Sequence, residues 1–391
     1  MTGVRTGLDR IAEGDTDVVR LVSGRDVGLL AHAASVDRRL RPAADVLGQA
    51  GARIRALFGP EHGFAGAAQD MVGVNSTQER EIAVHSLYGE DAEDLVPRPE
   101  WLRGLDALVI DLQDVGSRYY TYVWTAALAM KAAAAQGVEV VVLDRPNPLG
   151  GTRVEGAPQR EGYLSFVGLY PVAVRHGLTI AEVLRFVCDI EHLDHDVLQV
   201  VPMDGWRRAM EWRDTGLPWV MPSPNMPTLD TAMVYPGGCL IEGTTLSEGR
   251  GTTRPFELWG APGLDISGLL TLDLHGVALR PVEFVPTFQK HAGRPCRGVQ
   301  THVTDPWVFR PYESYLKMLR AVLPALPKAA RWRSEPYEFV SDRPAIDLLT
   351  GGPEFRLAVD SGAPLEEVLS EESRGAAKFD SERRSAWLYE K

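Results

Sequence analysis

A carboxylic acid and an imidazole stand side by side in the segment "LFGPEHGF". Glu61 and His62 follow three residues typical of the end of a buried strand, and Gly59, Pro60 and Gly63 set the backbone around them. Glu and His side chains transfer protons to and from reacting groups in many enzymes. Because a plain turn needs neither side chain, the segment indicates a strand that delivers a functional group.

Further ionisable and amide side chains follow the neighbouring aliphatic runs, which end in "DLQDVGSRYY" and "LDRPNP". In an open parallel sheet the carboxyl ends of the strands lie on one edge, and ligands bind in the crevice outside it. Any one of these residues could instead cap a helix or brace a turn. The side chains expected to converge there with Glu61 and His62 are Asp111, Gln113, Asp114, Arg118, Tyr119, Asp144, Arg145 and Asn147.

The elements that must position these side chains alternate short aliphatic runs with helical patterns. Strands are expected within residues 26–37, 53–63, 105–116, 138–148 and 197–203. Helices are expected within residues 41–51, 120–137 and 178–191, the last starting with a capping box of Thr179 and Glu182. Apolar runs separated by helices indicate a parallel sheet, so we expect an α/β domain of Rossmann-like type.

The composition of the chain changes at about Val220, where a long stretch rich in Pro, Gly, Ser and Thr begins. Strand and helix patterns follow in "GVALRPVEFVPTF", "GVQTHVTD" and "PYESYLKMLRAVL". We therefore expect a Rossmann-like domain over residues 1–220, carrying the catalytic Glu, and a smaller α+β domain over residues 221–391 that completes the cleft.

Composition argues against several classes of partner. The 391 residues carry a formal net charge of −12, which disfavours binding to nucleic acids or anionic membranes. No apolar run approaches the ~20 residues of a membrane span. The charged first residues do not resemble a secretory signal, so a cytoplasmic location is expected. Cys188, Cys239 and Cys296 show no pairing motif, which fits a reducing compartment. The oligomeric state stays open.

Three kinds of chemistry lack their usual motifs. The turn after the first expected strand, "AHAASVDRRLRP", has no glycine, and no GxGxxG or Walker pattern occurs, so no nucleotide cofactor is expected. Histidines show no zinc-ligand spacing, so no metal is expected. No serine lies in a GxSxG elbow.

Carboxylates and their neighbours remain. The carboxylates are Glu61, Asp111, Asp114, Glu242 and Glu248. They are accompanied by the aromatic residues Tyr119, Tyr120, Tyr122 and Trp124 and by the amides Gln113, Asn147 and Asn225. Paired carboxylates beside aromatic rings that stack on sugars are typical of glycoside hydrolysis, which is the leading option.

Longer motifs add a resemblance. The runs "LFGPEHGFAG", "SLYG", "DLQDVGSRYYTYVWT", "VVLDRPNPLGG", "PSPNMPT", "YPGGCLIEGTTLSEGRGTTRPFELWGAP" and "AWLYE" resemble the DUF1343 family. Its characterised members are the exo-acting β-N-acetylmuramidases known as NamZ. The resemblance extends from about residue 25 to the end, and several of its motifs exceed eight residues.

The resemblance implies a Rossmann-like domain joined to a smaller domain, with the site in the cleft between them. It also implies release of N-acetylmuramic acid from the non-reducing end of peptidoglycan fragments. Glu61 occupies the position of the glutamate proposed as catalytic in the family, and Glu242 and Glu248 match acidic positions of the second domain. Some relatives are exported, so recycling of fragments inside the cell stays one option.

On these residues Glu61 is the candidate general acid. Glu242, Glu248 and Asp114 are candidates for a second carboxylate, with Glu248 first. The acetamido group of the substrate could instead be the nucleophile. His62 braces the loop or bonds Glu61.

Substrate binding is expected from cations, amides and rings. The candidates are Arg118, Arg145, Arg250 and Arg254 for the lactyl carboxylate, Tyr119 and Tyr122 for the sugar face, and His62, Gln113, Asn147 and Asn225. The arginines could instead pair with Asp111, Asp114 or Asp144 inside the protein. The alternatives are a non-catalytic protein that binds cell-wall sugars and a hydrolase of another amino sugar.

Overall fold

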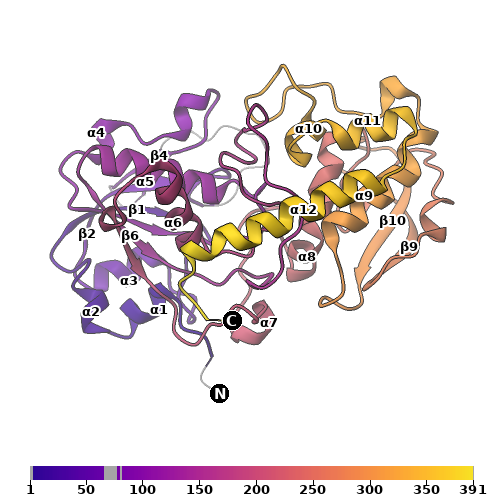
Figure 1. Cartoon of the computed structure of the whole chain (residues 1–391). Coiled ribbons are helices and arrows are strands. Elements are labelled where there is room, and N and C mark those ends of the chain that lie inside the picture. Colours follow the sequence, from indigo (N-terminus) through magenta and orange to yellow (C-terminus); the bar gives the residue numbers. More distant parts are fainter. Residues whose placement is uncertain (1–2, 66–76, 80–81, 391) are drawn as a thin grey trace.

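The computed structural model describes residues 3–65, 77–79 and 82–390. Figure 1 shows two halves side by side, one built on a large sheet and the other on a small sheet with its helices. Helix α12 (Glu366–Glu382) extends from the second half toward the first, and the two chain ends lie near each other (Figure 1). No helix in the described ranges has the length and apolar character needed to cross a membrane.

The large sheet has the strand order β3-β4-β2-β1-β5-β6-β7. Its strands are β1 (Asp26–Ala31), β2 (Arg53–Gly59), β3 (Thr77–Glu79), β4 (Ile82–Ser86), β5 (Ala107–Asp111), β6 (Glu139–Leu143) and β7 (Leu198–Val201). All neighbours run parallel except β3 and β4. The predicted α/β class is confirmed, and β3 and β4 are additions to the predicted strands.

Helices cover both faces of this sheet because successive side chains of a strand point to opposite faces. Val27 and Leu29 of β1 pack in one apolar cluster with Leu47, whereas Leu30 packs in a second cluster with Met130. The helices of this half are α1 (Gly7–Ala12), α2 (Thr16–Val19), α3 (Ala43–Gln49), α4 (Pro99–Leu102), α5 (Tyr122–Ala135), α6 (Ile180–Glu191) and α7 (Trp212–Thr215).

Two predicted helix boundaries are confirmed. Helix α5 ends just before Gly137, which has a φ of +69°, a value that glycine adopts at little cost. Helix α6 begins with the expected capping box: the Thr179 side chain accepts from the Glu182 backbone N–H, and the Glu182 side chain accepts from the Thr179 N–H.

The second half contains an antiparallel sheet with the order β8-β10-β9. Its elements are α8 (Leu229–Gly238), β8 (Leu258–Ala261), β9 (Val277–Phe284), β10 (Cys296–Val303), α9 (Pro311–Val322), α10 (Ala345–Thr350), α11 (Glu354–Ser361) and α12. Short 3₁₀ turns, labelled η1 to η7, cover Ala92–Leu95, His195–Val197, Cys239–Gly243, Leu269–Thr271, Leu323–Ala325, Lys328–Ala330 and Arg383–Ala386. The predicted domain boundary at residue 220 lies between α7 and α8, and the division there stays a prediction.

The chain end returns to the first half. The Tyr389 hydroxyl lies 2.5 Å from an Asp144 carboxyl oxygen, just beyond β6, and accepts from the Met203 N–H at 3.0 Å. Burial raises the pKa of Asp144 to about 7, so this carboxyl is largely neutral below that pH. Tyr389 therefore packs against the segments that follow β6 and β7 of the large sheet.

Candidate active site

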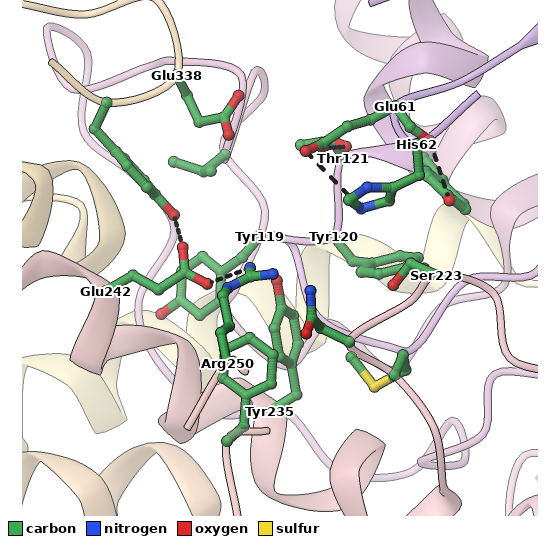
Figure 2. Close-up of a pocket in the computed structure, with 16 residues that line it drawn as sticks. Glu61, His62, Tyr119, Tyr120, Thr121, Ser223, Tyr235, Glu242, Arg250 and Glu338 are labelled. Atoms are coloured by element: carbon green, nitrogen blue, oxygen red, sulfur yellow. Dashed lines mark hydrogen bonds and ion pairs between the residues drawn. The ribbon is translucent and has the colours of Figure 1, made fainter. Parts of the chain in front are cut away.

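A pocket receives side chains from both halves of the chain. Figure 2 shows Glu61 and His62 on one side, Glu242 and Arg250 on the other, and tyrosine rings between them. The lining residues are Glu61, His62, Tyr119, Tyr120, Thr121, Tyr122, Val167, Ser223, Asn225, Met226, Tyr235, Glu242, Arg250, Phe256, Tyr337 and Glu338.

The turn after β2 brings Glu61 to this pocket. The chain reverses so tightly that a Cβ on Gly59 would lie 2.4 Å from the Phe64 nitrogen. The Gly63 N–H donates to the Pro60 carbonyl at 2.9 Å, and His62 and Gly63 have φ values of +70° and +79°. A non-glycine residue in this region is uncommon and strained. The turn holds His62 in this strained conformation and directs Glu61 toward the pocket.

Two hydroxyl groups contact Glu61, one at its carboxyl and one at its backbone. Its Oε2 accepts from the Thr121 hydroxyl at 2.8 Å, and its backbone carbonyl lies 3.2 Å from the Tyr122 hydroxyl, which also lies 2.9 Å from the Pro222 carbonyl. His62 Nε2 is 3.9 Å from Glu61 Oε1, which is longer than a hydrogen bond. This distance fits a His62 that braces the turn.

A buried histidine supports this side from behind. His32 Nε2 accepts from the Gln113 N–H at 3.0 Å, so the proton is on Nδ1, which lies 3.1 Å from the Pro222 carbonyl. Burial lowers the pKa of His32 to about 3, so the ring is neutral. Its edge packs on Tyr122 with centroids 4.9 Å apart. His32 therefore fixes Tyr122, which contacts Glu61.

The opposite side is built around a charged pair. Glu242, in η3, accepts from Arg250 Nη2 at 2.7 Å and from the Tyr337 hydroxyl at 2.7 Å. Burial by itself raises the pKa of Glu242, but Arg250, the Tyr337 hydroxyl and Lys290 outweigh it, so the pKa lies below its usual value. Glu242 is therefore an anion over the ordinary pH range.

Glu248 lies behind this pair and is not among the lining residues. Its carboxylate is 3.0 Å from Lys290 Nζ and 3.5 Å from Arg250 Nε. Lys290 also lies within 3.2 Å of the carbonyl oxygens of Ile241, Glu242 and Leu246. Glu248 thus orients the cations that face Glu242.

An aromatic floor separates the two sides and consists of Tyr119, Tyr120, Tyr235 and Phe256. The Tyr235 ring meets Phe256 edge to face at 4.8 Å and Tyr120 at 6.0 Å. Burial raises the pKa of both tyrosines, so the phenols stay neutral. The floor offers apolar ring surface for a sugar face together with neutral hydroxyl groups.

Most side chains predicted at or after the ends of β5 and β6, Asp111 and Asp144 included, lie outside the pocket lining. Arg145 binds both carboxylate oxygens of Asp111, at 2.5 and 2.8 Å. The Gln113 amide donates to the Asp114 and Pro146 carbonyls, and Asn147 donates to the Leu178 carbonyl. Asp114 faces His176 at 3.3 Å and accepts from the Gly116 N–H. These groups bond each other and the backbone, which holds the sheet edge together, although Gln113 Oε1 and Asp114 Oδ1 have no hydrogen-bond partner among the described residues.

Arg118, Arg254 and Glu248 are the other predicted site residues that lie outside the pocket lining. Arg118 is buried and donates to the carbonyls of Ala157, Val172 and Leu349. Arg254 is 43% exposed and lies 3.5 Å from Glu257. The predicted residues that do line the pocket are Glu61, His62, Tyr119, Tyr122, Asn225, Glu242 and Arg250.

Glu338 lines the pocket and was not among the predicted site residues. It lies in "PYEFV", which shares no spacing with the other motifs. It accepts from the Tyr88 hydroxyl at 3.2 Å, across 250 residues of sequence. In the sequence, Glu338 is distinguished only by its two aromatic neighbours, and this pattern is too common to predict a site residue.

No cluster of three or more His, Cys, Asp or Glu arranged for a metal ion occurs in the described part of the chain. The pocket offers instead a carboxyl held by hydroxyl groups, an anion held by an arginine, and ring surface. This set can protonate a leaving group and stabilise positive charge on a polar ring.

The first half has a mostly parallel sheet, the second has a small antiparallel sheet, and both contribute carboxylates to one pocket. The fold and site therefore define an α/β protein with a carboxylate-lined pocket between two halves. The chain belongs to the exo-β-N-acetylmuramidase NamZ family: the family's N-terminal model matches residues 27–230 and its C-terminal model matches residues 233–389. The predicted family membership is confirmed.

Relatives agree along the whole length. The chain is 40% identical to the peptidoglycan β-N-acetylmuramidase NamZ of Bacillus subtilis (strain 168), covering 99% of this chain and 91% of that protein. A crystal structure of a DUF1343 family protein from Bacteroides fragilis NCTC 9343 matches with a TM-score of 0.87 and 30% identity, over 100% of both chains. A second one from that organism matches in fold, with a TM-score of 0.75, 24% identity and 99% of both chains covered.

Proposed function

We propose that this protein is an exo-β-N-acetylmuramidase that releases N-acetylmuramic acid from the non-reducing end of peptidoglycan fragments. The near full-length identity to the Bacillus subtilis enzyme supports the activity. The observation that carries the mechanism is the position of Glu61, held by the Thr121 hydroxyl and facing the Glu242–Arg250 pair across the aromatic floor. A cytoplasmic location stays a prediction.

Glu61 is the proposed general acid. A glycosidic oxygen is a poor leaving group until it gains a proton, so protonated Glu61 donates to it as the bond to the anomeric carbon breaks. The Thr121 hydroxyl donates to Oε2 and thereby orients the carboxyl. Glu61 is only 4% exposed, so bulk water has little access to the carboxyl.

Glu242 is the proposed second carboxylate, ahead of Glu248 and Asp114, because it lines the pocket and they do not. Its lowered pKa keeps it anionic, which suits stabilisation of the positive charge that develops on the sugar ring. It can do so directly or by holding the acetamido group of the substrate in place as an internal nucleophile.

Arg250 is the proposed partner of the lactyl carboxylate. Of the four predicted arginines it is the one in the pocket lining, and its guanidinium stacks over Phe256 at 5.1 Å. A guanidinium has five N–H donors, so a group that already binds Glu242 retains donors for a second carboxylate.

The test is hydrolysis of a chromogenic β-glycoside of N-acetylmuramic acid, followed by NMR of the anomeric proton of the released sugar. We expect release of the free sugar and weaker activity on the matching N-acetylglucosamine glycoside. Retention of configuration would support a covalent or acetamido-assisted route, and inversion would support direct attack by water. No release from either glycoside would refute the proposal.

A further inference from the structure

Glu338 lies across the pocket from Glu61. Figure 2 shows Glu338 on the side of Glu242 and Glu61 on the other side, both above the tyrosine rings in this view. Glu338 is 4% exposed and lines the pocket. One of its oxygens accepts from the Tyr88 hydroxyl at 3.2 Å. An ionised carboxylate accepts hydrogen bonds at both oxygens, so one that lines a pocket can also accept from a ligand hydroxyl.

The backbone that carries Glu338 is strained. Glu338 and Phe339 have φ values of +46° and +66°, although neither is glycine. They form a tight turn closed by Tyr337 and Val340, whose N–H groups and carbonyls pair in both directions at 2.9 and 3.0 Å. Such strain persists where the surroundings over-determine it, and it is common at functional sites.

Aromatic contacts hold this turn from the other half of the chain. The Phe339 ring meets Tyr88 at 5.6 Å and Phe166 at 6.2 Å, both edge to face. Tyr88 and Phe166 lie 6.1 Å apart. The Glu338 carboxylate is therefore fixed against residues of the first half, on the same pocket that contains Glu61.

The geometry of a pyranose ring relates the positions of Glu61 and Glu338 to two atoms of the substrate. The bond that is cleaved is at carbon 1, and the hydroxyl at carbon 4 lies at the far end of the same ring. The proposed function places Glu61 at the glycosidic oxygen, Glu242 at the anomeric carbon or the acetamido group, and Arg250 at the lactyl group. Glu338 is the remaining carboxylate among the described lining residues and is left for the 4-hydroxyl. Resting on the proposed function, we propose that Glu338 accepts a hydrogen bond from the free 4-hydroxyl of the terminal sugar and thereby determines exo-specificity.

The chemistry separates a terminal sugar from an internal one. Inside a glycan chain, oxygen 4 belongs to an ether linkage and carries no proton, so it cannot donate. The Glu338 carboxylate would then face the ether oxygen, which is also an acceptor, and would lack the hydrogen bond that a 4-hydroxyl donates. Sites built to bind a substrate hydroxyl strongly reject analogues that lack it. A carboxylate that requires a 4-hydroxyl therefore admits only the chain end.

The experiment compares two glycosides of N-acetylmuramic acid with the same leaving group, one with a free 4-hydroxyl and one with a 4-deoxy ring. We expect wild type to prefer the 4-hydroxyl substrate by about 10²-fold in kcat/KM, as for a hydrogen bond to a charged group. Glu338→Ala should lose most of that preference, and Glu338→Gln, which keeps one acceptor, should retain part of it.

The matched control is Glu335→Ala, an exposed acid of the same segment, which should keep the wild-type ratio. Tyr88→Phe removes the hydroxyl that holds Glu338 and should lower the ratio without changing the acid, which covers the case in which Glu338→Ala fails to fold. An unchanged ratio in Glu338→Gln and Tyr88→Phe would overturn the assignment. Failure of wild type to cleave either glycoside would refute the proposed function itself.

Discussion

Two glutamates on opposite sides of one pocket have nearly equal exposure and opposite surroundings. Glu61 is 4% exposed and Glu242 is 3% exposed. The Thr121 hydroxyl bonds the Glu61 carboxyl, whereas an arginine and a phenol bond Glu242. Burial alone does not assign a role to a carboxyl: Arg250 and the Tyr337 hydroxyl keep the pKa of Glu242 below its usual value despite its burial.

The two sides also differ in how they are built. A strained turn at the end of β2 carries Glu61. Glu242 lies in η3 among charged partners that depend on it in turn. Loss of Glu61 should therefore remove activity and leave stability intact, whereas loss of the Glu242 partners should reduce both.

The largest effect is expected from Glu61→Gln. The amide keeps the size of the side chain and cannot donate the acid proton, so kcat should fall by about 10²- to 10⁴-fold. The free energy of unfolding, measured with urea, should stay close to that of wild type. Glu90→Gln, an exposed change outside the pocket lining, is the control. Near-normal kcat in Glu61→Gln would end its assignment as the acid.

The next effect is expected from Arg250→Met. Removing one partner of a buried ion pair costs about 3–5 kcal/mol of unfolding free energy, because Glu242 keeps its charge. Activity on the N-acetylmuramic acid glycoside should fall more than activity on the N-acetylglucosamine glycoside. Arg254→Met is the matched control, and its half-exposed pair should contribute about 0–1 kcal/mol. Equal losses on both glycosides would remove the lactyl assignment.

A smaller effect is expected from Thr121→Val, which removes the hydroxyl that orients Glu61. The shape is kept, so kcat should fall by about tenfold, as for one hydrogen bond. Thr125→Val removes a hydroxyl one turn further along α5, which bonds the Thr121 carbonyl. That control should leave kcat unchanged, and an equal loss in both variants would mean that helix packing, rather than Glu61, was altered.

The smallest effect is a pH dependence of stability. The pKa of Glu242 is lowered in the folded protein, so its stabilising contribution is present above its usual value of 4.5 and is lost as pH falls through the folded value. Wild type should therefore exceed Glu242→Gln in stability at pH 7, and the gap should narrow at pH 4. Urea unfolding of both proteins at the two pH values measures this, and a constant gap would contradict it.

The α/β class, the capping box at Thr179 and the place of Glu61 after β2 were predictable because they depend on local patterns. The pairing of Asp111 with Arg145 was harder. The sequence places both near the ends of neighbouring strands, with Ile110 paired to Val142. Arg145 is three residues beyond Val142, and its long side chain reaches Asp111 before any ligand can. Strand ends on one edge are necessary for a site but not sufficient.

Glu338 could not be predicted from the sequence for a different reason. Its turn has two positive φ values without a glycine, and the residues that enforce them come from the other half of the chain. Tyr88 lies 250 positions away along the chain. No period or local motif encodes such a contact, so only the folded chain could show it.

The bond between Tyr389 and Asp144 has a consequence for synthesis on the ribosome. The first sheet is translated early, yet the phenol that contacts Asp144 lies 245 positions further along the chain. The amino-terminal half therefore stays incomplete until Tyr389 has been synthesised. Truncations that spare every residue of the pocket but remove Tyr389 should give proteins that proteases degrade quickly.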